Sequence, residues 1–238
     1  MDHSQISFLK QDYLHNALLL SLLNNNQATI IDSSTTSLLL YDKISDAYYL
    51  NDQSINPIDL SLLQTIKPNQ YLVLHNPELL NILLSKGFMI DITCYNAVYT
   101  ATTTLPLRDD VIIKQCTFND LEIVMSTYSH PVDQTYIQDI IINNQLYAAY
   151  YQQQFVGYVG YHKEGSIGML EVLKDYQRQG FASHLLSFMV NQRIKEKKIA
   201  FSQIEYSNLA SRKLHQKLHF EFSSQPIYWL KKQSSTHE

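Results

Sequence analysis

One stretch of this sequence, residues 177–182, restricts the fold more than any other. It reads Gln-Arg-Gln-Gly-Phe-Ala and stands between a strand-like run, 166–173, and an amphipathic helical run from Phe181 to about Lys197. Gly180 lets the backbone approach a ligand closely, because it has no side chain. The first N–H groups of a helix lack intrahelical partners, and the helix dipole favours negative charge there. The stretch therefore predicts a phosphate-binding turn between a strand and a helix.

Composition excludes several other classes of protein. The chain has 238 residues, of which 45% are hydrophobic and 17% charged, and its net charge is −4. These values are typical of a globular protein with one large domain or two small ones. A net negative charge does not favour nucleic acid as a partner, and the short basic run at 193–198 ends a helix, where cations are stabilised.

The cysteines and the apolar runs bear on location and on metal binding. Cys94 and Cys116 are too few for a disulfide framework or a four-cysteine zinc site, so we expect a reducing compartment and no metal. The first five residues do not form a basic signal region, and no apolar run approaches the 18 residues of a membrane span. We therefore expect a cytoplasmic protein without a membrane partner.

Glycine is distributed unevenly along the chain. Only Gly87 precedes residue 150, whereas the other five glycines lie between 157 and 180. Such a shift suggests two units with different backbone requirements. The polar segment 101–110, interrupted by Pro106, is the best linker candidate. The sequence therefore predicts two lobes, at residues 1–105 and 106–238.

The second lobe contains a regular succession of predicted elements. Their order is β-α-α-β-β-β-α-β-α-β-β, which indicates a mixed α/β sheet. The last two strands are expected to pair with each other. The predicted ranges are 111–117, 118–129, 134–144, 146–151, 155–161, 166–173, 181–197, 199–206, 208–218, 220–222 and 227–230.

This order resembles that of the GNAT superfamily of acyl-CoA-dependent N-acyltransferases. The resemblance covers about residues 110–232 and implies an α/β fold with a mixed, mostly antiparallel central sheet flanked by helices. The family signature is Gln/Arg-x-x-Gly-x-Gly/Ala after a strand that ends near a valine. An asparagine often begins the last helix and a Gly-Phe pair follows it. The matching residues are Gln177, Gly180, Ala182, Val172, Asn208 and Phe220.

The resemblance also implies which residues bind acetyl-CoA. The backbone of Val172 and Leu173 is expected to pair with the pantetheine amides, by strand addition. Asn208 is expected either to cap its helix or to hold the CoA arm. The phosphates are expected at the turn, on Gln177, Arg178, Gln179, Gly180, Phe181 and Ala182.

Two residues are candidates for catalysis. Glu171 is the only acidic residue on the central strand, and we predict it as the base that deprotonates an amine; the alternative is a solvent-facing strand glutamate. His215 stands where many family members have a tyrosine that acts as an acid, and the alternative is a histidine on the polar face of its helix. His219 replaces the glycine that often precedes Phe220.

The first lobe contains a related pattern. A strand, 71–76, a helix from Pro77 to Ser85 and the residues Lys-Gly-Phe at 86–88 precede the similar run 203–220 by 132 residues without gaps, and an alternating strand, 89–100, follows them. We interpret this as a duplication that produced a degenerate GNAT-like lobe; the alternative is coincidence between two ordinary β-α-β segments. The window 45–50, which is 132 residues before the phosphate turn, has no glycine, so this lobe is expected to be structural or to shape the acceptor pocket.

These observations predict an N-acetyltransferase that moves an acetyl group from acetyl-CoA to a small-molecule or peptide amine. Neither the acceptor nor the oligomeric state is specified, and a homodimer remains open. A non-catalytic acyl-CoA-binding module is the main alternative, because His215 and His219 depart from the family pattern. An aminoacyl transferase that uses charged tRNA is a third, and the acidic net charge and the intact turn count against it.

Overall fold

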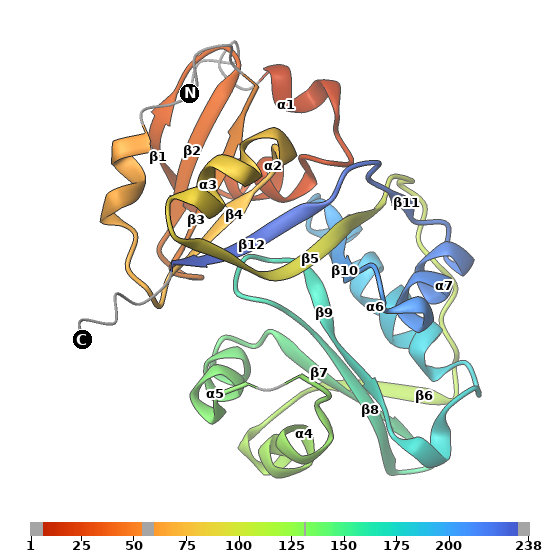
Figure 1. The fold of residues 1–238 in the computed structure, drawn as a ribbon. Helices are drawn as coiled ribbons and strands as arrows, with labels where there is room; N and C mark the ends of the chain where they lie inside the picture. The colour runs from red at the N-terminus through yellow and green to blue at the C-terminus, as the bar shows by residue number, and fades with distance from the viewer. Residues whose placement is uncertain (1–6, 54–59, 131, 233–238) are drawn as a thin grey trace. The chain divides into compact units, whose positions relative to one another are not determined.

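The computed structural model describes residues 7–53, 60–130 and 132–232, and Figure 1 shows the course of the chain. Packing divides the chain into two compact units. Unit 1 comprises residues 1–98, 203–209 and 221–238, and unit 2 comprises residues 99–202 and 210–220. This division differs from the predicted split at 105/106, because two late segments pack with unit 1.

Unit 1 is built on an eight-stranded sheet with the order β1-β2-β3-β4-β12-β5-β10, and β11 pairs with β5 off this path. The pairs β1–β2, β2–β3, β12–β4, β12–β5 and β11–β5 are antiparallel, and β3–β4 is parallel. The strands are β1 (Ala28–Ser33), β2 (Ser37–Asp42), β3 (Ala47–Asp52), β4 (Tyr71–Leu74), β5 (Phe88–Tyr99), β10 (Ala200–Glu205), β11 (Glu221–Phe222) and β12 (Ile227–Lys232).

The helices of unit 1 are short, and α2 is the most deeply buried. Seven of its eight residues, 17–23, are buried, so the apolar run there belongs to the core. No helix within the described ranges is both long and apolar enough to cross a bilayer. The helices are α1 (Ser7–Gln11), α2 (Ala17–Asn24), α3 (Leu80–Ser85) and the 3-10 turns η1 (Leu60–Thr65) and η2 (Pro77–Leu79).

Unit 2 contains a four-stranded antiparallel meander with the order β6-β7-β8-β9. Its strands are β6 (Val111–Gln115), β7 (Leu146–Tyr151), β8 (Gln154–Tyr161) and β9 (Ile167–Val172). Its helical segments are η3 (Phe118–Asp120), α4 (Leu121–Thr127), α5 (Gln134–Ile142), η4 (Lys174–Tyr176), α6 (Phe181–Lys195) and most of α7 (Leu209–Lys217).

Helices cover both faces of the unit 2 sheet (Figure 1). Val124 of α4 and Ile140 of α5 pack in one core with Ala148 and Tyr158 of the sheet. The neighbouring Tyr147 instead contacts Phe188 of α6, with 5.2 Å between ring centroids. Successive residues of a strand point to opposite faces, so α6 lies on the face opposite to α4 and α5. The prediction of a mixed, mostly antiparallel α/β fold is confirmed.

The two closing strands were expected to pair with each other, but they do not. β11 pairs with β5, and β12 lies between β4 and β5. Burial explains the difference, because Ile227 and Leu230 have no exposed surface in this position. The 12-residue strand β5 also presents enough edge for both partners. The end of the chain therefore completes the sheet of unit 1.

Segment 101–110 is a strap on α6 and is not a free linker. Leu105 donates its N–H to the Asn191 side chain at 2.8 Å and accepts a hydrogen bond from the same amide at 2.9 Å. Three residues later, Arg108 donates its N–H to Nδ1 of His184 at 3.0 Å. Because Asn191 and His184 are two helical turns apart on α6, the strap runs along the helix.

The predicted repeat has matching local geometry at the end of each helix. Gly87 follows α3 with a φ of +85°, and His219 follows α7 with a φ of +62°. Glycine adopts this left-handed conformation without strain, whereas a histidine there carries a cost of about 1–2 kcal/mol. His219 thus keeps the turn that a glycine would make. Common ancestry of the two segments stays a prediction.

Candidate functional site

β9 offers one backbone edge to a ligand within its four-stranded sheet, where it pairs with β8 alone. Leu173 donates its N–H to Val156 O of β8 at 2.9 Å. Successive residues of a strand turn their N–H and C=O groups to opposite edges, so those of Val172 face away from β8. The Val172 carbonyl accepts a hydrogen bond from Gln177 Nε2 at 3.1 Å. The predicted pairing of Val172 with the pantetheine amides stays a prediction, whereas the N–H of Leu173 is hydrogen-bonded within the sheet.

A bulge bends β9 just before these residues. Tyr158 pairs with Glu171 and Gly160 pairs with Gly168, so β9 has one residue more than β8 between the two pairs. Met169, inside this interval, has a φ of +50°. A bulge of this kind redirects the strand that follows it. The sequence analysis did not foresee it, because methionine gives no signal for positive φ.

The turn after β9 has the strand-turn-helix geometry that the sequence predicts. Arg178 and Gly180 both have left-handed backbones, with φ of +60° and +88°. Gly180 is the N-cap of the 15-residue helix α6, and no side chain caps this end. His184 N–H closes the first helical turn on Gly180 O at 3.1 Å. Within the described part of the chain, the backbone N–H groups from 178 to 183 donate no hydrogen bond, which leaves these donors for an anion.

Three side chains of the turn, those of Gln177, Gln179 and Phe181, contact other groups of the protein. Gln177 holds Val172 O, and Gln179 Nε2 donates to Asp175 O at 2.9 Å. Phe181 is 1% exposed and packs edge-on against Tyr151 and Tyr176. These contacts fix the loop, so the backbone is the part of it that remains for a ligand. Arg178 is exposed, and its predicted role beside the phosphates stays a prediction.

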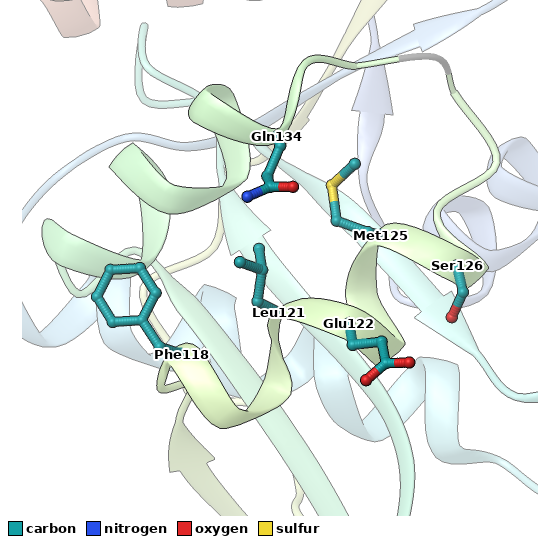
Figure 2. A pocket seen from close by; sticks show the side chains of 6 residues that line it. All are labelled: Phe118, Leu121, Glu122, Met125, Ser126 and Gln134. Carbon is teal, nitrogen blue, oxygen red and sulfur yellow. The ribbon is translucent and has the colours of Figure 1, made fainter.

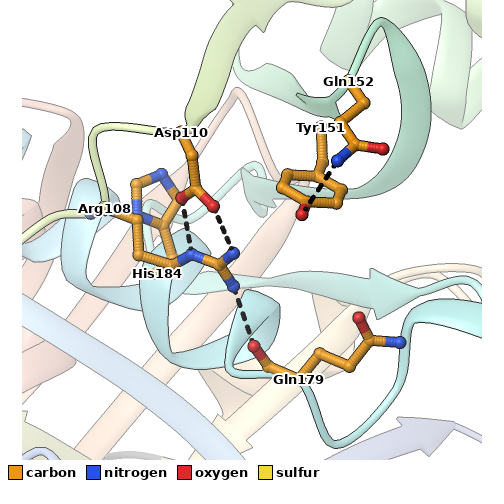
Figure 3. A network of polar contacts seen from close by, with 6 residues as sticks. All are labelled: Arg108, Asp110, Tyr151, Gln152, Gln179 and His184. Carbon is orange, nitrogen blue, oxygen red and sulfur yellow. Dashed lines mark hydrogen bonds and ion pairs between the residues drawn. The ribbon is translucent and has the colours of Figure 1, made fainter.

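Arg108, which the sequence analysis did not single out, holds this turn from the strap (Figure 3). Its Nη1 donates to Gln179 O at 2.8 Å, and its Nε and Nη2 donate to the Asp110 carboxylate at 2.9 and 2.8 Å. The guanidinium lies 4.5 Å from the centre of the Phe181 ring. The hydrogen bond from Arg108 lowers the pKa of the exposed Asp110. No local pattern marks Arg108 as a residue of this turn, because Gln179 and Phe181 lie far from it along the chain.

The order of these elements agrees with a known family. Residues 117–220 match the sequence model of the acetyltransferase (GNAT) family. The chain contains a GNAT acetyltransferase domain. This match supports an enzyme whose general activity is acyl transfer. No curated protein sequence matches the chain.

Solved structures share the fold over nearly the whole chain. A Drosophila protein has 14% identity and a TM-score of 0.70 and covers 96% of this chain and 94% of its own. A GCN5-related N-acetyltransferase from Kribbella flavida has 10% identity, a TM-score of 0.62 and coverages of 95% and 96%. A GCN5-related N-acetyltransferase-like protein from Streptococcus suis has 17% identity, a TM-score of 0.54 and coverages of 95% and 98%. At such identities the likeness shows the fold alone.

In the GNAT domain, Glu171 points to the face that α4 and α5 cover. It pairs in register with Tyr158, which belongs to that core. Its carboxylate accepts hydrogen bonds from Ser129 in the α4–α5 connection, at 2.5 Å from the hydroxyl and 3.2 Å from the N–H. Burial, with Glu171 and Glu164 nearby, raises the pKa of Tyr128 to about 12. The Glu171 carboxylate is therefore fixed by hydrogen bonds from Ser129 and lies near the Tyr128 phenol, which stays protonated at neutral pH. Its role as the base stays a prediction.

His215 lies in the core, contrary to its predicted role as an acid. It is 5% exposed and packs edge-on against Phe220 at 4.7 Å. Its Nδ1 donates to Ser211 O at 2.8 Å, so Nε2 accepts from the Ser202 hydroxyl at 2.9 Å. Burial lowers its pKa to about 4. A neutral ring with both nitrogens hydrogen-bonded has no proton ready to donate, and the core histidine is the better interpretation.

Asn208 immediately precedes α7 and is among the residues that pack with unit 1. Its N–H donates to Glu205 O at 3.0 Å. Its contribution to holding the CoA arm stays a prediction. Among the described residues, no group of three or more His, Cys, Asp or Glu side chains could hold a metal ion.

An open hollow of about 500 Å³ lies beside α4 and α5 of the GNAT domain (Figure 2). It runs between η3, α4 and the start of α5, and none of the predicted site residues lines it. Its walls combine apolar and polar side chains, which are Phe118, Leu121, Glu122, Met125, Ser126 and Gln134.

Proposed function

We propose that this protein is an N-acetyltransferase that transfers an acetyl group from acetyl-CoA to an amine. The observation that carries the proposal is the adjacency of two backbone features. The outward edge of β9 ends at Val172, and eight residues later Gly180 stands at the N-cap of α6, where no side chain caps the helix. An extended amide chain followed by a pyrophosphate, as in CoA, suits this order of donors.

The exposed N–H groups of the turn suit the negative charge of a pyrophosphate. An exposed turn of N–H groups at a helix start binds phosphate oxygens without a metal or a charged side chain. A Cβ on Gly180 would have Arg108 Nη1 as its nearest neighbour at 3.8 Å, so steric crowding within the protein does not require the glycine. The left-handed backbone of Gly180, with a φ of +88°, is what favours glycine there, and the missing side chain leaves the approach to the turn open.

Chemistry at the thioester needs a free amine and a leaving thiolate. In the proposal, Glu171 takes the amine proton directly or through water, while Ser129 holds the carboxylate in place. An alkyl thiol has a pKa near 8.5, so a thiolate can leave and collect its proton from water at neutral pH. The reaction therefore does not require His215 as an acid.

The acceptor is a small-molecule or peptide amine of unidentified structure. A cytoplasmic location and the absence of a nucleic-acid partner belong to the proposal, as does the origin of the first lobe from a degenerate GNAT-like unit. Thiol release from acetyl-CoA in the presence of a panel of amines tests the enzyme directly. CoA binding without release for any amine would instead support the alternative, a non-catalytic acyl-CoA-binding module.

Gly180→Asp tests the phosphate-binding turn. The new carboxylate would repel the pyrophosphate, and we expect calorimetry to detect no CoA binding. Gly180→Ala is the matched control, because it introduces the same left-handed strain without the charge and should retain measurable binding. Equal CoA affinity of the wild-type and aspartate proteins would contradict the assignment.

Glu171→Gln tests the base. The amide keeps the size of the side chain and can still accept from Ser129, but it cannot take a proton. We expect the turnover rate to fall 10²- to 10⁴-fold with CoA affinity nearly unchanged, the usual range for a positioned base. An unchanged rate would assign the proton to another group or to ordered water.

A further inference from the structure

The strap that carries Arg108 is hydrogen-bonded at three points to α6 and to the turn that precedes it. Leu105 is hydrogen-bonded to Asn191, and the Arg108 N–H to His184. The Arg108 guanidinium is hydrogen-bonded to Gln179 just before the helix start (Figure 3). The His184 ring is 5% exposed, and its Nδ1 accepts the strap's N–H. The main chain at Arg108 is thus fixed on the first turn of α6. The direction from which its side chain approaches the phosphate-binding turn is fixed as well.

The bond from Arg108 to Gln179 O determines where the next N–H points. The Gln179 carbonyl and the Gly180 N–H belong to one planar trans peptide, in which the two groups point in opposite directions. Arg108 draws the carbonyl toward the strap at 2.8 Å, so the Gly180 N–H is directed away from the strap. We propose that Arg108 is a positioning residue that orients this N–H toward the CoA pyrophosphate. The inference rests on the proposed function.

Without Arg108 this peptide has little to keep its orientation. A peptide flip rotates ψ of Gln179 and φ of Gly180, and glycine accepts either sign of φ. Gln179 and Gly180 are both exposed, so no packing opposes the rotation. A flip would present a carbonyl oxygen to the phosphates in place of an N–H. One misplaced group would then replace an attraction by a repulsion.

Arg108 acts through geometry more than through its charge. The Asp110 carboxylate takes its Nε and Nη2 in a two-pronged ion pair, and one face of the guanidinium lies on Phe181. The ion pair is electrically neutral at a distance, and Asp110 holds the guanidinium at its angle to Gln179. If Arg108 acts by positioning the turn, neutralising Asp110 should weaken CoA binding. If Arg108 acts by its charge, the same change should strengthen CoA binding.

The test measures CoA affinity by calorimetry and pantetheine affinity by NMR titration for the full chain. Arg108→Met keeps most of the length of the side chain and its contact with Phe181 but removes every side-chain donor. We expect about a 10-fold loss of CoA affinity, the size of one charge-assisted hydrogen bond. Pantetheine, which lacks the pyrophosphate, should bind as it does to the wild type. Arg108→Lys should recover part of the loss through a single donor, and Lys114→Gln, which removes a charge from β6, should bind CoA normally.

Asp110→Asn distinguishes positioning from charge. Loss of the anchor should weaken CoA binding about 3-fold if Arg108 positions the turn, since the ion pair is largely exposed. Tighter binding would mean that a freed positive charge attracts the phosphates, and it would overturn the inference. Equal losses for CoA and pantetheine in Arg108→Met would show a general structural defect and would overturn it too. A wild-type protein that binds no CoA would overturn the proposed function itself, whereas unchanged CoA binding by Arg108→Met would overturn only this inference.

Discussion

Gly157→Ala should separate β9 from β8 beside the proposed donor-binding residues. A Cβ at this position would lie 2.4 Å from Glu171 O and 3.0 Å from Val172 Cα. Relaxed carbon–oxygen contacts between strands are about 3.3–3.6 Å, so β9 would have to move by about 1 Å. Both obstacles are backbone atoms, which cannot turn aside as a flexible side chain would. Within its sheet β9 is paired on the β8 side alone, so it would yield outward.

The expected cost follows from two opposing effects. Forcing an extra methyl group into a packed position costs about 1–3 kcal/mol. Replacing glycine by alanine in a strand returns about 0.5–1 kcal/mol of backbone entropy. The middle of these ranges gives a net destabilisation of about 1 kcal/mol, which in a chain of this size lowers Tm by roughly 2–4 °C. Locally, the bond from Leu173 N–H to Val156 O should weaken most, because it is the next rung of the ladder.

Thermal melting and hydrogen exchange of the Leu173 amide measure the two effects separately. Gly87→Ala in unit 1 is the control, because a Cβ there meets nothing within 4 Å and the only cost is the φ of +85°. It should lower Tm slightly and leave the Leu173 amide unchanged. If Gly157→Ala melts at the wild-type temperature and Leu173 exchanges at the wild-type rate, the close approach of β8 and β9 at this glycine is wrong.

Three further substitutions test particular contacts. The pKa of His215 is about 4 in the folded protein and near 6.5 in the unfolded chain, so the unfolded chain binds the proton first and the protein loses stability as the pH falls. This loss amounts to about 2 kcal/mol between pH 7.5 and 5. His215→Gln should remove it, which urea unfolding at the two pH values measures. Arg193→Met should cost about 2 kcal/mol in the same assay, because the buried guanidinium donates to Gly165 O at 2.6 Å; a stability equal to the wild type would contradict this. Asn76→Ala should lower stability by about 1 kcal/mol, since it removes the acceptor of the Glu78 N–H and the amide that donates to Asp52 O, and a stability equal to the wild type would refute the cap.

Much of the GNAT domain could be predicted from local sequence. The hairpin of β7 and β8, the strand β9 and the helix α6 follow from alternating residues, turn residues and an apolar periodicity. These signals are local because each element satisfies most of its hydrogen bonds with near neighbours. The strand-turn-helix at Gly180 was predictable for the same reason, since its glycine, its strand and its helix are contiguous in the chain.

Contacts between distant segments were not predictable in the same way. Nothing near Arg108 indicates that it will bind Gln179, and nothing in β12 indicates that it will lie between β4 and β5. The bulge at Met169 gives no composition signal either. The burial of His215 was not predictable either, because a histidine on a short helix has the same local pattern whether it faces solvent or the core.

The sequence by itself determined that a strand, a glycine turn and a helix follow one another at 177–182, and it identified the family that this order resembles. The tertiary structure decided which groups of that motif remain for a ligand. It turned the backbone of Val172 outward and that of Leu173 inward, used the side chains of Gln177 and Gln179 inside the loop, and brought Arg108 to the carbonyl before Gly180. The physical reason is that backbone conformation is largely a local property, whereas the partner of each polar group depends on which segments the core brings together.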